Sequence, residues 1–304
     1  MANKTAPLLI AIGASLWGII GVFVTYLYEM GFTPIQVVAI RVLTAAIFMS
    51  TYLLFKNRHL FKIKPRDSRY FIGTGIISIV LFNWCLFSSM EESSISIAFI
   101  LLYTAPAFVT ILSRILFKES LTFRKVTALL ITLVGCSLVI GIFSNSAESL
   151  SLYGLIIGLG SGFFYALYSI FGKAALSKYD SLTVTVYTFL FASVAIVPFS
   201  GLGSMVATFT NLKVWGLVIG LGFLSTMLPF IFYTKGLHHV ESSRASIIAT
   251  IEPVVASFIG FFIFNETLSL WQYIGMILVI SSVIIVQESK KRKGAQPLYH
   301  KAEA

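Results

Sequence analysis

Two charged side chains lie toward the middle of long apolar segments of this 304-residue chain, and each could do chemistry there. Glu252 stands in the apolar run 245–264, where an ionised carboxylate at the centre of a bilayer would cost about 2.5–3.5 kcal/mol. Such a group could couple to protons or bind a substrate amine. It could equally be a protonated or hydrogen-bonded carboxylate that fixes helix packing beside Pro253. Small residues at helical spacing favour an inward-facing position for it: Ala245, Ala249, Ala256 and Gly260.

Arg41 is the second charge of this kind, and it lies in the apolar run 34–55. At a rise of 1.5 Å per residue, it stands roughly 6 Å from the centre of that run. Its guanidinium could bind a substrate carboxylate, reach the membrane interface or lock a neighbouring helix. We favour the structural interpretation. Arg114, one turn from Lys118, is expected at the interface.

Polar and aromatic residues near the middle of other apolar runs could form a cavity with aromatic walls and a few polar groups. For each aromatic residue, ordinary helix packing is the competing interpretation. Asn83 is a special case, because an amide at membrane depth must find hydrogen-bond partners. The candidates are Trp17, Asn83, Trp84, Tyr103, Thr104, Tyr165, Ser225, Thr226, Thr250 and Glu252.

Prolines and glycines in these runs suggest places where helices bend or touch. Pro106, Pro229 and Pro253 each remove a backbone hydrogen bond, so each could be a hinge or a static kink. Gly154, Gly158 and Gly162 recur every four residues and predict a close helix contact. Two acids, Glu119 and Glu266, end their apolar runs and could be caps or gate-side contacts, but an ordinary solvated position is the favoured interpretation.

Several kinds of chemistry are excluded by what the sequence lacks. It has no Gly-rich loop ending in Gly-Lys-Ser/Thr, so ATP hydrolysis does not drive it. Cys85 and Cys136 lie at membrane depth, and the four histidines lie in loops, which favours neither a disulfide framework nor a metal site. We therefore expect no cofactor, no metal and no enzymatic activity.

The elements that must position these residues are membrane helices. The chain is 57% hydrophobic and 11% charged, with a mean hydropathy of +0.91, which no soluble domain of this size would have. Its apolar runs are continuous and about 20 residues long, as spanning helices require. The ten runs are 7–27, 34–55, 70–90, 95–117, 125–143, 152–174, 181–200, 212–234, 245–264 and 271–287.

An internal duplication organises these ten helices. Position i matches position i+147 along the chain, most clearly for 98–121 against 245–268, where Pro106 aligns with Pro253 and Glu119 with Glu266. Five helices per copy is an odd number, so the second copy must be inverted. We predict an all-α integral membrane protein with a first repeat in 1–147, a second in 148–288 and a basic tail in 289–304.

The basic residues set the expected orientation. Nine of them follow the second and fourth runs: Lys56, Arg58, Lys62, Lys64, Arg66, Arg69, Lys118, Arg124 and Lys125. Their counterparts at i+147 include one basic residue, Lys213. Because Lys and Arg collect in cytoplasmic loops, both termini should be cytoplasmic. The net charge of +10 then reflects orientation and attraction to anionic lipid headgroups, with no nucleic-acid partner.

The joint pattern resembles the drug/metabolite transporter superfamily, and specifically its EamA branch. The resemblance rests on ten helices in two inverted halves and on motifs at matching places: Trp17-Gly18, Arg41, Pro106, Glu252-Pro253, Glu119 and Glu266. One departure is that Ala105 precedes the proline in the first half where Glu252 does so in the second. Two symmetric acidic sites are therefore not expected.

The resemblance implies a secondary active transporter of the plasma membrane, such as a bacterial inner membrane, that exports small metabolites, amino acids or drugs. It also implies a cavity lined by helices 1, 3, 4, 6, 8 and 9, with the second helix away from it. Inverted repeats favour alternating access independently. Protons and a second copy of the chain are further candidate partners. A sugar or nucleotide-sugar importer or exchanger and a receptor or scaffold are the alternatives.

Overall fold

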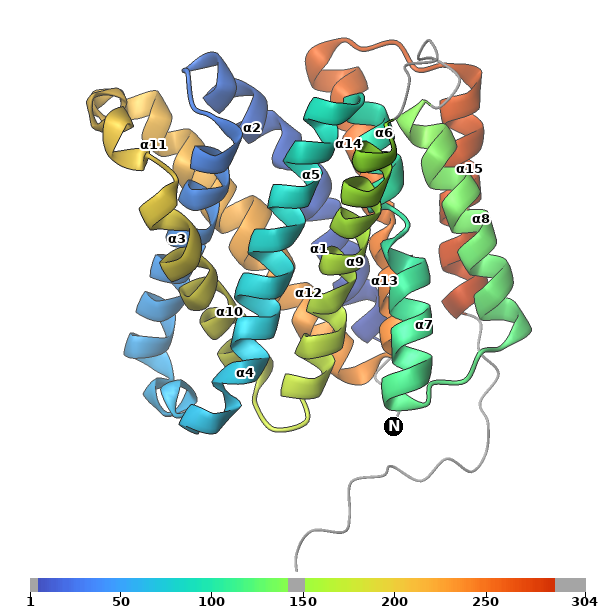
Figure 1. The fold of residues 1–304 in the computed structure, drawn as a ribbon, viewed down its shortest axis with the longest axis horizontal. Helices are drawn as coiled ribbons and strands as arrows, with labels where there is room; N and C mark the ends of the chain where they lie inside the picture. The colour runs from blue at the N-terminus through green and yellow to red at the C-terminus, as the bar shows by residue number, and fades with distance from the viewer. Residues whose placement is uncertain (1–4, 142–150, 288–304) are drawn as a thin grey trace, which may run out of the picture.

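The chain forms a bundle of helices, and Figure 1 shows them standing roughly upright beside one another. The computed structural model describes residues 5–141 and 151–287, and no strand occurs in these ranges. Ten helical segments there are long and apolar enough to cross a membrane, which confirms the ten predicted spans. They are Ala6–Glu29, Pro34–Phe55, Pro65–Glu92, Ile95–Phe117, Phe123–Ile140, Leu152–Ala175, Ser181–Phe199, Leu212–His239, Ser242–Phe264 and Leu270–Gln287.

Several of these spans contain more than one helical element. The α-helices are α1 (Ala6–Gly18), α2 (Ile20–Glu29), α3 (Pro34–Lys56), α4 (Ser68–Phe71), α5 (Leu81–Glu92), α6 (Ile95–Leu102), α7 (Ala105–Phe117), α8 (Phe123–Ile140), α9 (Leu152–Ala175), α10 (Ser181–Ile196), α11 (Leu212–Ile219), α12 (Leu228–His239), α13 (Ser242–Ala249), α14 (Ile251–Phe264) and α15 (Leu270–Gln287). Two π-helical stretches, η3 (Ile72–Val80) and η6 (Gly220–Met227), lie inside the third and eighth spans. Four 3-10 segments complete the set: η1 (Arg58–Phe61), η2 (Pro65–Asp67), η4 (Val197–Phe199) and η5 (Leu202–Thr210).

Two predicted parts fall outside the described residues. They are the tail 289–304 and all but the last residue of the linker 143–151.

The fourth and ninth spans are broken at equivalent places. α6 gives way to α7 at Tyr103 and Thr104, and α13 gives way to α14 at Thr250. Pro106 and Pro253 lie in the first turn of the helix that follows, where a proline needs no backbone N–H. The Thr104 and Thr250 hydroxyls each donate to the carbonyl three residues earlier at 2.6 Å. Each break is therefore stabilised locally in the same way.

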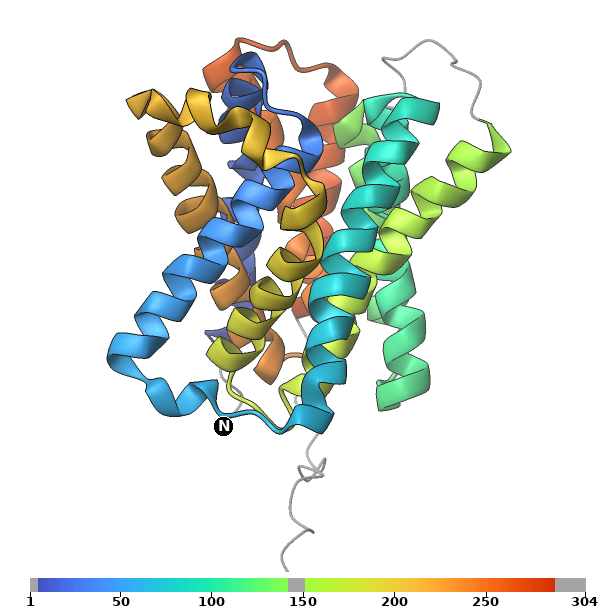
Figure 2. The ribbon, with the colours of Figure 1, turned by 60° about the vertical axis from the view of Figure 1, so that its left-hand side comes forward.

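The contacts between helices recur in the two halves. α1 packs on α12 and α14, and its counterpart α9 packs on α5 and α7. The counterpart helices α3 and α10 pack on each other, as do α8 and α15. Figures 1 and 2 show α3 and α10 side by side and running in opposite directions. The fold is thus the predicted architecture of two inverted five-helix repeats.

The two ends of the bundle differ in packing. We name the end that holds the start of α1, the end of α7 and the start of α13 the N-terminal face, and the end that holds the start of α6 and the end of α14 the opposite face (Figure 1). At the N-terminal face α13 packs against α7, α8 and α9. Among the described residues, the counterpart pairs of α6 with α14, α15 and α1 lack comparable packing. The N-terminal face is therefore the more tightly closed one.

Candidate functional site

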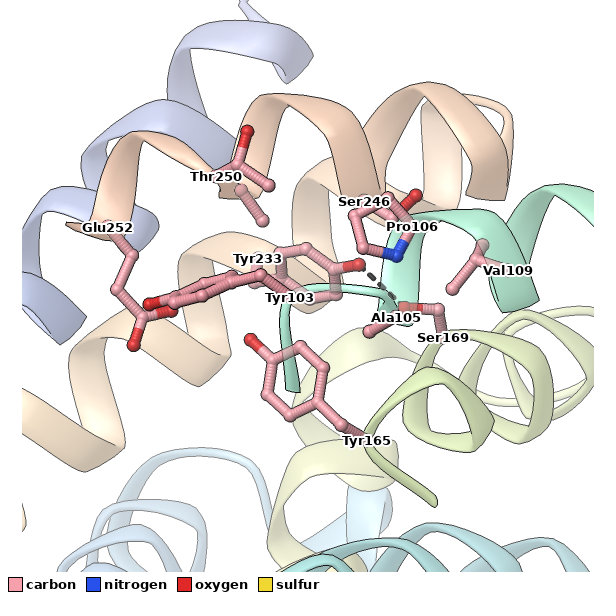
Figure 3. A pocket seen from close by; sticks show the side chains of 11 residues that line it. Tyr103, Ala105, Pro106, Val109, Tyr165, Ser169, Tyr233, Ser246, Thr250 and Glu252 are labelled. Atoms are coloured by element: carbon pink, nitrogen blue, oxygen red, sulfur yellow. Dashed lines mark hydrogen bonds between the residues drawn. The ribbon is translucent and has the colours of Figure 1, made fainter. Parts of the chain in front are cut away.

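A small cavity lies where the helix breaks of the two repeats meet. Its walls come from the break residues and from α9 and α12 (Figure 3). The volume of about 20 Å³ is room for about one water molecule. The lining residues are Tyr103, Ala105, Pro106, Val109, Tyr165, Ser169, Tyr233, Ser246, Ala249, Thr250 and Glu252.

A second cavity of about 20 Å³ adjoins the first and shares Tyr165, Ser169 and Tyr233 with it. Its other walls include Trp17 of α1 and Phe82 of α5. Together the two cavities are lined by residues of both repeats, from α1, η3, α5, α7, α9, α12, α13 and α14. In this conformation they admit nothing much larger than water, so a metabolite needs a more open state to enter.

Glu252 is the acidic residue in the lining of the first cavity. It lies in the first turn of α14, where the partial positive charge of a helix N-terminus stabilises a carboxylate. Figure 3 shows its carboxylate beside the Tyr103 hydroxyl, with the Tyr165 ring pointing toward the same space. The break before α14 therefore has two effects. It interrupts the helical backbone hydrogen bonds, and it places the Glu252 carboxylate at a helix N-terminus.

Arg41 reaches the same region from α3. Its Nε donates to the Thr226 hydroxyl of η6 at 3.3 Å, and that hydroxyl donates in turn to the Leu221 carbonyl at 2.8 Å. The guanidinium also lies close enough to Glu252 and Tyr165 to interact with them electrostatically. Arg41 thus makes a hydrogen bond to a neighbouring segment, and the choice between a structural and a substrate-binding role stays a prediction. No described residue of α3 lines either cavity, in keeping with the expected place of this helix away from the cavity, and Arg41 acts on the site by charge alone.

Five predicted cavity residues line these two cavities. Tyr103, Tyr165, Thr250 and Glu252 line the first, and Trp17 lines the second. The Trp17 ring packs on Phe230, and its buried Nε1 has no hydrogen-bond partner among the described residues. Buried polar groups are nearly always paired, so this free donor marks a place for a water or ligand.

Other predicted candidates lie elsewhere. Asn83 is buried, and its amide donates to the Ile79 carbonyl of the preceding turn at 2.7 Å, so it satisfies its donor within its own span. Trp84 is 55% exposed and lines neither cavity. Thr104 lies against Gly162 of α9 instead of facing the cavity. Ser225 is buried near the Arg41 contact and has no hydrogen-bond partner in the described ranges.

The prolines and glycines occupy the places that their chemistry suggests. Pro106, Pro229 and Pro253 all lie in the first turn of a helix that begins inside a span. Side chains at Gly158 or Gly162 would collide with Leu101 of α6, so these glycines mark the predicted close helix contact. Whether the prolines act as hinges stays a prediction.

Tyr168, Ser169 and Tyr233 are cavity residues that were missed from sequence. The Ser169 hydroxyl and the Tyr233 hydroxyl are hydrogen-bonded at 2.7 Å (Figure 3), and Tyr168 pairs with Thr234 at 2.6 Å. Both pairs join α9 to α12. The available signal was helical spacing, because Ser169 follows Tyr165 by four residues and so shares its face. Within the described ranges, no group of three or more His, Cys, Asp or Glu residues could hold a metal ion.

Comparison with known proteins identifies a family with this two-repeat architecture. The model of the EamA-like transporter family matches residues 4–141 and 152–287, one match for each repeat. A solved crystal structure with 14% identity superposes with a TM-score of 0.76 over 93% of this chain and 96% of that one. At this identity the superposition concerns the fold alone.

Curated relatives that match more than two thirds of the chain point the same way. An uncharacterized transporter of Archaeoglobus fulgidus is 30% identical over 69% of this chain and 75% of its own length, and a second from that organism is 27% identical over 92% and 97%. The uncharacterized inner membrane transporter YicL of Salmonella typhimurium is 23% identical over 96% of this chain and 98% of its own. The family model covers both repeats, and the chain therefore belongs to the EamA-like transporter family as a multi-pass transporter of the plasma membrane.

Proposed function

We propose that this membrane transporter exports a small organic solute by alternating access, powered by a gradient across the membrane. The observation that carries the proposal is the position of Glu252 at the junction of two broken helices, one from each repeat. Transporters built from inverted repeats bind their substrates near such interruptions, because free backbone groups and helix ends can face a ligand there. The proposed direction, export, follows the family resemblance.

Glu252 has two candidate roles within this function, and the site supports both. It can carry the coupled proton, or it can bind a substrate ammonium group against the faces of Tyr103 and Tyr165. Arg41 gives the carboxylate a cation to interact with when the site is empty. A proton or a substrate amine that binds Glu252 would weaken that interaction, which is how occupancy of the site could reach α3 and η6.

The proposal is tested with purified protein in liposomes. Thermal unfolding in detergent first identifies a ligand class among amino acids, carboxylates, nucleosides, sugars and lipophilic cations, since a ligand at 100 times its Kd adds about 2.7 kcal/mol of stability. The hit is then used for flux driven by a pH gradient, with Glu252→Gln as the test variant. Glu91→Gln is the matched control, because Glu91 is an exposed carboxylate on α5.

Loss of pH-driven flux in Glu252→Gln with full flux in Glu91→Gln supports the coupling role. Full gradient dependence in Glu252→Gln removes Glu252 from that role. Exchange that needs the same solute on both sides of the membrane would favour the alternative of a sugar or nucleotide-sugar exchanger. Ligand binding without any flux would favour a receptor.

A further inference from the structure

Glu119 ties the two repeats together at the N-terminal face. It follows α7 of the first repeat, and its buried carboxylate accepts hydrogen bonds from the first turn of α13 in the second repeat. The donors are Ser242 N at 2.6 Å, Ser243 N at 3.2 Å and Ser243 Oγ at 2.5 Å. Buried Lys125 lies 3.9 Å from the same carboxylate and pairs with Glu241 at 3.0 Å. The acid therefore acts as an N-cap supplied by another repeat.

The turn that presents Glu119 is built a second time around Glu266. Lys118 and Asn265 both adopt the left-handed conformation, with φ of 55° and 54°. The backbone N–H of Glu119 donates to Ser113 at 3.3 Å, and that of Glu266 donates to Gly260 at 3.1 Å. Neither Lys118 nor Asn265 is a glycine, so the shared conformation is a specific feature of the repeated unit.

The target of Glu119 also has a counterpart in the first repeat. At the offset of 147, Ser242 and Ser243 correspond to Ile95 and Ser96, which form the first turn of α6. The first turn of any helix has backbone N–H groups without intrahelical partners. Ser96 also keeps the hydroxyl that Ser243 uses to bind Glu119. The start of α6 can therefore receive a carboxylate as α13 does.

In this conformation the equivalent contact, between Glu266 and the first turn of α6, is not formed. The Glu266 carboxylate lies over Gly260 of α14, the helix that it follows, in the space that a side chain at position 260 would need. No hydrogen bond joins it to α6 among the described residues, and Ser94 caps α6 by accepting from Ile97 N at 3.3 Å. The packing agrees, because α13 contacts α7 whereas α6 lacks comparable packing against α14.

We propose that Glu119 and Glu266 alternate as latches between the repeats. When Glu119 releases α13 and the N-terminal face opens, Glu266 leaves Gly260 and caps α6 at Ile95 and Ser96, which closes the opposite face. The proposal rests on the proposed function, since it supplies the contacts that alternating access would exchange. Each state keeps one carboxylate cap and leaves one open, so the two states differ little in the number of such bonds.

The latches are tested by cross-linking cysteine pairs in native membranes, in a background with Cys85→Ala and Cys136→Ala. The pair Glu119→Cys/Ser243→Cys reports the latch that is closed here. The pair Ser96→Cys/Glu266→Cys reports the latch proposed for the other state. A third pair, Ser96→Cys/Glu119→Cys, joins opposite faces and is the control that must not cross-link.

We expect both latch pairs to cross-link, and a ligand that favours one state should raise one yield while it lowers the other. The proposal is overturned if the Ser96/Glu266 pair never cross-links while the same membranes transport solute, an outcome that leaves the proposed function intact. Cross-linking of both pairs without flux of any tested solute supports the latches and counts against transport.

A second measurement keeps both carboxylates. Gly260→Ala fills the space in which the Glu266 carboxylate now lies, and Gly216→Ala is the control because nothing lies within 4 Å of a Cβ there. We expect Gly260→Ala to raise maleimide labelling of a Ser243→Cys reporter about fivefold, the factor that corresponds to a shift of about 1 kcal/mol. Equal labelling rates in the two glycine variants would show that Glu266 does not control the N-terminal face.

Discussion

Arg41 and Glu252 place opposite charges near one cavity between the repeats. Their energetic coupling can be measured by a double-mutant cycle. We expect Arg41→Gln to destabilise the protein, because it leaves the Glu252 carboxylate without its cation. Addition of Glu252→Gln should recover part of that loss, with an interaction free energy of about 0.5–3 kcal/mol. Thermal unfolding of the four proteins in detergent measures it, and strict additivity would show that the two charges act independently.

Trp17 offers a second prediction at this scale. Trp17→Phe keeps an aromatic ring against Phe230 but removes the buried Nε1 donor that has no partner among the described residues. Removal of an unpaired buried donor is favourable, but the smaller ring also leaves a cavity, so stability should change by no more than about 1 kcal/mol. Tyr168→Phe is the comparison, since it breaks the hydrogen bond to Thr234 and should destabilise. A ligand that uses the indole donor would bind Trp17→Phe more weakly.

Sequence reasoning found those site residues whose chemistry is unusual for their surroundings. A carboxylate in an apolar run stands out, and Glu252 lines the cavity as expected. Ser169 and Tyr233 are ordinary in sequence and became visible once the fold brought α9 against α12. Trp84 shows the opposite error, because rotation about the helix axis decides whether a ring faces the cavity or the outside, and hydropathy does not fix that rotation.

The close packing of α8 on α15 depends on the absence of a Cβ atom at Gly275. A Cβ at Gly275 would lie 2.7 Å from both the Gly135 carbonyl and the Val139 backbone nitrogen. We expect Gly275→Ala to cost about 1–3 kcal/mol, since backbone atoms must move to admit it. Gly216→Ala on α11 meets nothing within 4 Å and should be neutral or stabilising by about 0.4–1 kcal/mol. Thermal unfolding of the two variants tests the difference.

The spans were predicted well and their interruptions were not. Hydropathy sums over about 20 residues and is unaffected when a helix stops and restarts inside the membrane. Pro106 and Pro253 did indicate where α7 and α14 begin, because proline suits the first turn of a helix. The π stretches η3 and η6 contain no proline, so no local signal distinguished them from α-helix.

Orientation in the membrane is a property of the whole molecule, and it is still an expectation from the basic loops. His59 and Ser204 are exposed on η1 and η5 and serve as reporters, while Cys85 and Cys136 are buried. A membrane-impermeant maleimide should label Ser204→Cys in intact cells and His59→Cys only after permeabilisation. The reverse pattern would invert the assignment of both termini.

Two inverted repeats were predictable from the offset of 147, but the difference between the two faces was not. Because the two repeats are similar in sequence, closure at the N-terminal face and closure at the opposite face are equally compatible with the sequence. The structure shows one of them, with Glu119 bound to α13 and Glu266 unbound to α6 among the described residues. The choice depends on the balance of contacts between repeats, which residue types alone do not reveal.

The size of the central cavities has a consequence for the membrane that houses them. Each holds about one water molecule, so they provide no continuous chain of water along which protons or ions could pass. In this conformation a water-filled path is interrupted in the middle of the bundle as well as at the more tightly packed N-terminal face. We therefore expect the protein in this conformation to conduct no ion current across a bilayer, so that idle copies leave the ion gradients of a membrane intact.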